Sequence, residues 1–528
     1  MPKSATGMDL QWRTHQLVVG RDPLALSERE WMLGNGTGGF SMGPAAGINT
    51  RRYHGLLVAC ESPPVGRVVA LNQMLEQLFV STGNRQVALE FAACLFRDDR
   101  KHEVVAPDGN TLLRRFDKGL SVSWHYASGQ ITFVRELYLH WKQQAATLRY
   151  LIDGLDNADA ATLNLRPMLT LRNFHGLLNK NEAGPIAVDV KNATVTVRRV
   201  QTAATIQCDH GQFMNHSDWW YNIFYPLDAE RGQESQEDYF TPGFFEIDLD
   251  TTQPIAVTLT IALGAKPVES SAWSSKLRQH HLTRVLEHLG NDTPASGAPI
   301  KRIFAIAADD FVVDRTVGEE KYSTIMAGYP WFADWGRDTF VALPGLLLET
   351  GRFDEAKATL HTFAQAIRKG LVPNRFDDYQ QGSAHYNTVD ASLWFVHSAI
   401  HYVEYSSDIA SWNQWLSSAV KQVLDAYIHG TEYDIKVTGD GLISAGSADK
   451  QLTWMDAAHS SQVFTPRQGK AVEINALWYN ALAGTASLFA ATEKRAADHY
   501  GKLARRILQL GERLGCLDKV LPEAVGGL

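Results

Sequence analysis

The chain has 528 residues, too many for one ordinary core, so we expect about two large domains. Its composition, 45% hydrophobic and 20% charged, is that of a globular enzyme. A formal charge of −8 argues against nucleic acid or an anionic membrane as a partner and favours a neutral polymer. Four scattered cysteines predict neither a zinc site nor a disulfide framework, and we expect no metal and no cofactor.

The location that the sequence favours is cytoplasmic. The opening stretch MPKSATGMDLQWRTHQ lacks the apolar run of a signal peptide, and no stretch reaches membrane-spanning length without charge. The oligomeric state is not predicted by any pattern in the chain.

Residues 1–265 have the pattern of short β-strands. Apolar and polar residues alternate in ATVTVRRVQTAATIQC, QITFVRELYLHW and TLRYLIDGL, and again in FFEIDLD and PIAVTLTIAL. Many strands without helices between them predict an N-terminal β-sandwich domain. Residues 266–299 are charged and predict a helical linker.

Residues 300–528 have a helical period. We predict seven helices, at about 301–315, 338–350, 353–369, 390–406, 409–429, 473–492 and 495–514. The connections after the second, fourth and sixth helices are short, which makes those pairs antiparallel neighbours. The three long connections should therefore emerge at one end of the array, where loops usually carry function.

One glycine-rich stretch, WMLGNGTGGF, contains a formal G-x-G-x-x-G at Gly34, Gly36 and Gly39. A dinucleotide site needs a helix after the last glycine. The following FSMGPAAGINTRRYHG has glycines and a proline that oppose a helix, so we expect a tight turn at the edge of the β-domain instead.

The first long loop, GYPWFADWGRDTF (328–340), combines aromatic rings with opposite charges. Rings cover the apolar faces of a sugar, while carboxylates and a guanidinium bind its hydroxyls. Asp338 also precedes an apolar helix, so capping is the alternative explanation. The candidate sugar contacts in this loop are Trp331, Asp334, Trp335, Arg337 and Asp338.

The other two long loops supply further candidates. Asp390 either caps its helix or contacts substrate, and the position of Glu473 at a helix start has a purely structural explanation in the helix dipole. Asp456 lies at no predicted helix end, so it is the stronger candidate for acid chemistry, which needs a raised pKa. The remaining candidate substrate contacts are Arg375, Tyr386, Asn387, Trp454 and Arg467.

Several long motifs, read together, resemble one family. They are EWMLGNGTGGFSMGPAAGINTRRYHGLLVA (30–59), AGYPWFADWGRDTFVALPGL (327–346), YNTVDASLWF (386–395) and TWMDA with TPRQGKAVEINALWYNAL (453–482). In this order they resemble the glycogen debranching enzyme family in its bacterial and archaeal amylo-α-1,6-glucosidase form. The resemblance extends to about residue 510.

The resemblance implies a β-sandwich followed by an (α/α)6 barrel. It also implies inverting hydrolysis of a single α-1,6-linked glucose at a branch point of glycogen or another branched α-glucan. In this family Trp335, Arg337 and Asp338 would hold the terminal glucose, and Asp456 would be the general acid.

The chain departs from the family where the general base is expected, at a glutamate late in the barrel. Only about seven of twelve helices are readable, so we expect a partial barrel over 300–528 in a truncated member, and the general base is not identified. Two other functions stay open: a glucan-binding remnant without the base, and another (α/α)6 glycosidase resembling glucoamylase or trehalase.

Overall fold

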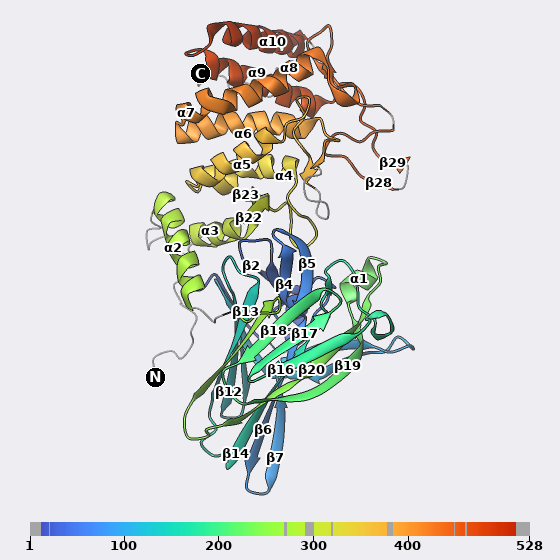
Figure 1. The fold of residues 1–528 in the computed structure, drawn as a ribbon, viewed down its shortest axis with the longest axis vertical. Coiled ribbons are helices and arrows are strands. Elements are labelled where there is room, and N and C mark those ends of the chain that lie inside the picture. Colours follow the sequence, from blue (N-terminus) through green and yellow to red (C-terminus); the bar gives the residue numbers. More distant parts are fainter. Residues whose placement is uncertain are drawn as a thin grey trace. The chain divides into compact units, whose positions relative to one another are not determined.

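The computed structural model describes residues 12–20, 22–268, 272–290, 300–317, 320–376, 384–447, 449–459 and 462–513. The chain divides into two compact units, residues 1–314 and 315–528. Figure 1 labels the helices and strands of both units. None of the helices in the described ranges combines the length and apolarity needed to span a bilayer.

The first unit is built from antiparallel sheets. Counted over the described residues, the largest sheet has nine strands, the second seven and the third five. The nine-stranded sheet is formed, in spatial order, by β1 (His15–Val18), β10 (Leu113–Lys118), β11 (Val122–Ser128), β12 (Ile131–Leu139), β13 (Ala145–Asp153), β21 (Ile255–Leu263), β18 (Thr202–Cys208), β17 (Thr194–Arg199) and β16 (Ile186–Lys191).

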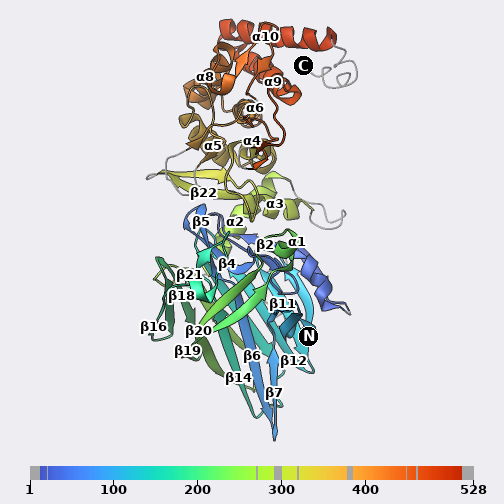
Figure 2. The same cartoon turned by 90° about the vertical axis from the view of Figure 1, so that its right-hand side faces the viewer.

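The other two sheets follow the same antiparallel pairing. The seven-stranded sheet is formed by β7 (Arg85–Glu90), β6 (Gln73–Thr82), β14 (Ala160–Met168), β20 (Gln236–Leu249), β19 (Gln212–Phe224), β8 (Ala93–Arg97) and β9 (Glu103–Asp108). The five-stranded sheet is formed by β15 (Arg172–Asn173), β5 (Val65–Leu71), β4 (Gly55–Ser62), β3 (Phe40–Pro44) and β2 (Glu30–Gly34). Figure 2 shows β6, β14 and β20 side by side.

The alternating sequence pattern places one row of each strand in the core. Along β13, Leu148, Tyr150 and Ile152 are buried, and they share a hydrophobic cluster with Leu163 of β14 and Phe245 of β20. The nine- and seven-stranded sheets therefore enclose one core, consistent with the sandwich that the sequence predicts. Four short helices lie between strands of this unit in the described residues: η2 (Pro23–Glu28), η3 (Gly109–Leu112), η4 (Lys180–Glu182) and α1 (Pro226–Glu230).

The glycine-rich stretch is a turn between two strands. β2 ends at Gly34 and pairs with β3, which begins at Phe40, so no helix follows the glycines. Gly36 has φ +73°, and a Cβ there would lie 2.8 Å from the Trp141 ring. The turn predicted from the sequence is confirmed, and the geometry of a dinucleotide fingerprint is absent from this stretch.

Two helices complete the first unit. α2 (Ala272–His288) lies in the predicted linker, and α3 (Ile300–Phe311) follows it. The first predicted helix was extended too far, because β22 (Val312–Val317) replaces its last residues. The β-branched pair Val312–Val313 favours a strand there.

The second unit consists mainly of helices. Its helical segments are α4 (Gly336–Leu343), η5 (Pro344–Leu348), α5 (Phe353–Gln365), α6 (Asp390–Ser406), α7 (Ile409–Ser411), η6 (Trp412–Leu416), α8 (Ser417–His429), η7 (Glu432–Asp434), α9 (Val472–Phe489) and α10 (Lys494–Arg513). Its short strands are β23 (Glu320–Ile325), β24 (Arg375–Phe376), β25 (Ala384–His385), β26 (Lys436–Val437), β27 (Ile443–Ser444), β28 (Ala458–His459) and β29 (Gln462–Val463).

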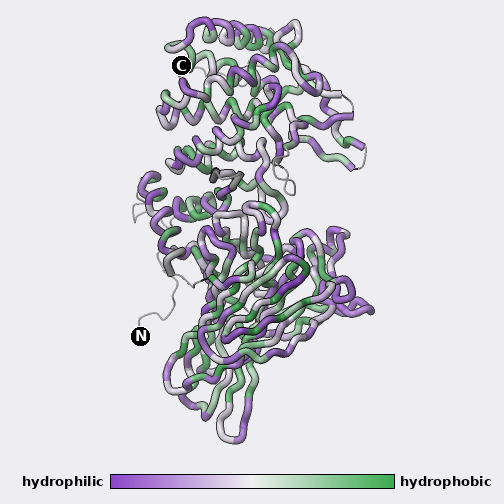
Figure 3. Tube along the Cα trace, viewed as in Figure 1, coloured by the Kyte–Doolittle hydropathy of each residue, from purple (hydrophilic) through white to green (hydrophobic). Residues whose placement is uncertain are grey.

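The helices pack through one apolar face each. On α10, Tyr500, Ala504 and Ile507 are buried at helical spacing, and Figure 3 shows apolar and polar residues alternating along this helix. The connections from α4/η5 to α5, from α6 to α7 and from α9 to α10 are short, as predicted. Figure 1 shows the long connection that carries β28 and β29 at the opposite end of the helices from α7.

Candidate active site

The three long connections of the helical unit meet. The amide of Gly336, at the end of the first, donates to the carbonyl of Asn374 in the second over 2.7 Å. The amide of Val389, at the end of the second, donates to the carbonyl of Leu452 in the third over 2.8 Å. Backbone hydrogen bonds thus join all three loops at one rim of the helices.

Arg337 is the centre of the polar cluster on this rim. Its Nε donates to Oδ2 of Asp390 over 2.7 Å, and its Nη1 donates to Oδ2 of Asp456 over 3.1 Å. The side chain is 12% exposed. Burial alone would lower the pKa of Arg337, but the charges of Asp390 and Asp456 raise it. One guanidinium therefore holds carboxylates from two different loops.

Asp390 is positioned by its helix but does not cap it. It is the first residue of α6, and its Oδ1 accepts a hydrogen bond from Thr388 over 2.7 Å. The Thr388 hydroxyl itself accepts from the amide of Ala391 over 3.2 Å. The two carboxylate oxygens of Asp390 are thus shared between Thr388 and Arg337, which leaves the capping explanation to Thr388.

Asp338 lies beside the arginine, in the first turn of α4. Burial raises its pKa, and the negative charges of Asp456 and Asp390 add to this effect, while Arg337 lowers it. A carboxyl whose pKa is raised by burial and by neighbouring carboxylates is typical of functional sites.

Aromatic rings border the polar cluster. Trp335 pairs with Arg375 through an antiparallel β-bridge, and the Arg375 guanidinium lies 5.8 Å from its ring centre. Phe332 meets Trp335 edge to face, with the ring centres 6.0 Å apart. Trp454, two residues before Asp456, is 56% exposed. These rings offer apolar surface beside charged groups.

Arg467 and Glu473 form a second pair on the third loop. The Arg467 Nη2 donates to Oε2 of Glu473, in the first turn of α9, and its Nη1 lies 3.4 Å from the sulfur of Met455. Met455 precedes Asp456, so this arginine connects the acidic loop to the helix that follows it.

Two predicted contacts point elsewhere. Asp334 is fully buried and accepts hydrogen bonds from Arg315 and Thr324, so it fastens its own loop to β22 and β23. Tyr386 donates to the carbonyl of Ala366 and stacks with Arg368, 4.1 Å from the ring centre. The last two candidates differ in exposure: Asn387 is exposed, and Trp331 is half-buried.

Two residues that contribute to this rim were not predicted from the sequence. Thr388 positions Asp390, and a threonine just before a predicted helix was a readable capping pattern. Phe332 is 50% exposed, and only the tertiary structure shows that its ring meets Trp335.

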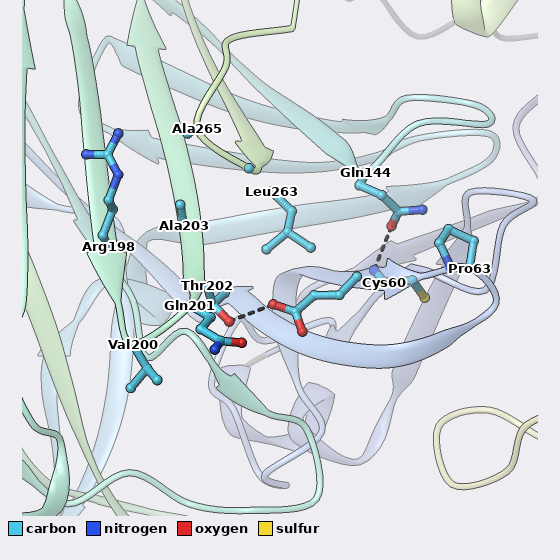
Figure 4. A pocket seen from close by; sticks show the side chains of 12 residues that line it. Cys60, Pro63, Gln144, Arg198, Val200, Gln201, Thr202, Ala203, Leu263 and Ala265 are labelled. Carbon is cyan, nitrogen blue, oxygen red and sulfur yellow. Dashed lines mark hydrogen bonds between the residues drawn. The ribbon is translucent and has the colours of Figure 1, made fainter. Parts of the chain in front are cut away.

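A cavity of the first unit contains none of the predicted site residues. Its volume is about 560 Å³, and it lies between the β4–β5 hairpin, the β17–β18 turn and the end of β21 (Figure 4). Glu61 accepts a hydrogen bond from Thr202 over 2.6 Å, and Gln144 accepts one from the amide of Cys60 over 2.7 Å. Four of its lining residues are thus paired with one another. Across the described ranges, no group of three histidine, cysteine or acidic side chains is arranged to hold a metal ion.

Two family models match the chain, one in each half. Residues 29–256 match the model described as glycogen debranching enzyme N terminal, and residues 306–512 match the model described as amylo-alpha-1,6-glucosidase. The chain has a sheet unit followed by helices that carry carboxylates and aromatic rings at one rim. Together with these matches, this architecture defines a protein of the glycosidase class. The chain belongs to the glycogen debranching enzyme family.

The individual proteins that resemble this chain share less than 30% sequence identity with it. The glycogen debranching enzyme of Saccharomyces cerevisiae is 29% identical over 222 residues, an alignment covering 31% of this chain and only 14% of the yeast enzyme. A bacterial glucoamylase complexed with acarbose superimposes with TM-score 0.48 at 9% identity, over 92% of this chain and 67% of its own. A putative kojibiose phosphorylase from the human microbiome superimposes with TM-score 0.46 at 9% identity. The match covers 94% of this chain and 69% of the phosphorylase.

Proposed function

We propose that this chain removes α-1,6-linked glucose at the branch points of glycogen by inverting hydrolysis, with Asp456 as general acid. The observation that carries the proposal is the contact of one arginine, Arg337, with both Asp390 and Asp456. The family matches support the substrate class. In this proposal the helical unit is part of an (α/α)6 barrel.

The geometry supports binding of a sugar at the rim. The Nη2 of Arg337 is buried and has no hydrogen-bond partner among the described residues, so a sugar hydroxyl is the acceptor that would complete its hydrogen bonds. Trp335 and Trp454 supply apolar faces nearby. Asp456, with a side chain 35% exposed, is accessible to the leaving oxygen.

Inversion requires a second carboxylate about 6.5–9.5 Å from the acid, with water between the carboxylate and the sugar. The acid donates its proton to the glycosidic oxygen while the ionised partner takes a proton from the water. We assign Asp456 to the first role and no residue to the second. Glu473 is not assigned to the second role, because its carboxylate already accepts a hydrogen bond from Arg467.

Release of glucose from phosphorylase limit dextrin tests the proposal. The wild-type chain should release glucose, and Asp456→Asn should lower the rate by about 10²–10⁴-fold, the contribution of general acid catalysis. Asp449→Asn, at an exposed carboxylate of the same loop, is the matched control and should keep the wild-type rate. Absence of glucose above a blank, or an unchanged rate in Asp456→Asn, would contradict the proposal.

A second candidate is glucan binding without turnover, which the exposed rings Phe332 and Trp454 favour. It predicts measurable maltodextrin affinity that Trp335→Ala weakens, with no glucose released from limit dextrin. Turnover by the wild-type chain would exclude it. Parallel assays on maltose, trehalose and isomaltose distinguish a glucoamylase- or trehalase-like specificity from the α-1,6 preference.

A further inference from the structure

The first unit contains a second cavity, separate from the rim of the helical unit. Its volume is about 600 Å³, and its walls come from β1, β2, β10 and α3. Much of the lining is apolar, including Trp31, Phe116, Ile306 and Phe311. This volume lies in the range of about 300–1,000 Å³ that is usual for small-molecule sites.

Two carboxylates of the lining already have partners. Oδ1 of Asp310 accepts from the Nη2 of Arg278 over 2.5 Å and from the amide of Gly34 over 2.9 Å. Oε1 of Glu30 accepts from Arg51 over 2.7 Å and lies 3.0 Å from the ring nitrogen of His54. These negative charges are therefore largely satisfied within the protein.

Lys118 is a charged lining residue whose side chain has no direct hydrogen-bonding partner among the described residues. No hydrogen bond or ion pair joins its side chain to a residue in the described part of the chain, and the carboxylate of Asp310 acts on it through its charge alone. It lies two positions after Phe116 on β10, so both side chains leave the same face of the strand. Two other charged lining residues, Glu28 and Arg29, are exposed and of opposite sign.

We propose that this cavity binds a small monocarboxylate with an apolar body, whose carboxylate pairs with the ammonium group of Lys118. The apolar walls would cover the body of the ligand, and the ammonium group of Lys118 would select the anion. Burial lowers the pKa of Lys118, with a further contribution from Arg278 against the opposite effect of Asp310. An anion bound beside the lysine would compensate for this loss of hydration.

Isothermal titration of the full chain with octanoate, and separately with 1-octanol, tests the charge requirement without any substitution. Octanoate should bind at least tenfold more tightly than the neutral alcohol, because a hydrogen bond to a charged group commonly has an effect of that size. Equal affinities, or no binding of octanoate, would overturn the proposal.

Three variants then locate the site. Lys118→Met should weaken octanoate binding by tenfold or more, and Lys118→Arg should retain it. Ala307→Phe, at an exposed lining position, should block the cavity without changing its charge. Lys191→Met, at a lysine with a 79% exposed side chain, is the matched control. Wild-type affinity in both Lys118→Met and Ala307→Phe would overturn the assignment, whatever the result of the glucosidase assay.

Discussion

At the scale of single residues, Arg337 has the clearest consequences. Its planar guanidinium reaches Asp390 and Asp456 from separate nitrogens, whereas the single ammonium of a lysine cannot reproduce this fork. We expect Arg337→Lys to lower kcat/KM on limit dextrin by about 100-fold, a loss of about 2–3 kcal/mol in transition-state stabilisation. Lys450→Met, at a half-exposed lysine of the third loop, should leave kcat/KM unchanged. Near-normal kinetics in Arg337→Lys would show that the bridge is dispensable.

The lowered pKa of Glu30 predicts how the stability of the protein depends on pH. Burial would raise its pKa, but hydrogen bonds and charges from His54 and Arg51 lower it to about 2. Because the pKa in the folded state lies below the unfolded value, the resulting stability is present above about pH 4.5 and is lost as the pH falls toward 2. Glu30→Gln should lower the free energy of unfolding by about 2 kcal/mol at pH 6, and much less at pH 3. Urea unfolding of both proteins at the two pH values measures this, and a pH-independent difference would contradict it.

At the scale of elements, the start of α6 depends on one hydroxyl. Thr388 accepts from the Ala391 amide and donates to Asp390, so it both ends the loop and orients a site carboxylate. Thr388→Ala should destabilise the helical unit by about 1–2 kcal/mol, the usual effect of losing a capping side chain. Hydrogen exchange of the first turn of α6 measures the change. Thr388→Ser keeps the hydroxyl and should restore protection; equal loss in both variants would assign the effect to the missing methyl group.

At the scale of the whole molecule, the first unit has a charged pair inside its core. Arg135 of β12 and Glu76 of β6 are buried 3.2 Å apart, and the Arg135 guanidinium lies 4.1 Å from the centre of the Trp124 ring. Burial raises the pKa of Glu76, although the charge of Arg135 opposes this. The pair therefore links the two large sheets by charge as well as by packing.

Removing only the cation should be costly. Arg135→Met leaves Glu76 buried without its counter-charge, and we expect a loss of about 3–5 kcal/mol in the free energy of unfolding of the first unit. Hydrogen exchange along β12 and β13 reports on this unit. The double variant Arg135→Met, Glu76→Gln also removes the unpaired charge and should recover part of the loss. If the double variant were no better than the single one, packing rather than charge would explain the effect.

The sequence by itself determined the order of the two kinds of structure and most of the helices. Alternation of period two and helical periodicity are local properties, so β12, β13, α6 and α9 were readable within a few residues. The family motifs were readable for the same reason, because each is continuous along the chain. The extension of the first helix failed where β22 begins at Val312, because this strand pairs with β23.

Only the tertiary structure decided which members of each motif share a site. Asp334 and Arg337 are three residues apart, yet one is buried against Arg315 and the other reaches Asp456, 119 residues away. Such partners are chosen by the packing of helices and loops, which brings distant segments together and sends neighbouring side chains in different directions. The charge of Lys118 and the cavity it lines depend in the same way on β10 and α3, which are separated by most of the β-sandwich in sequence.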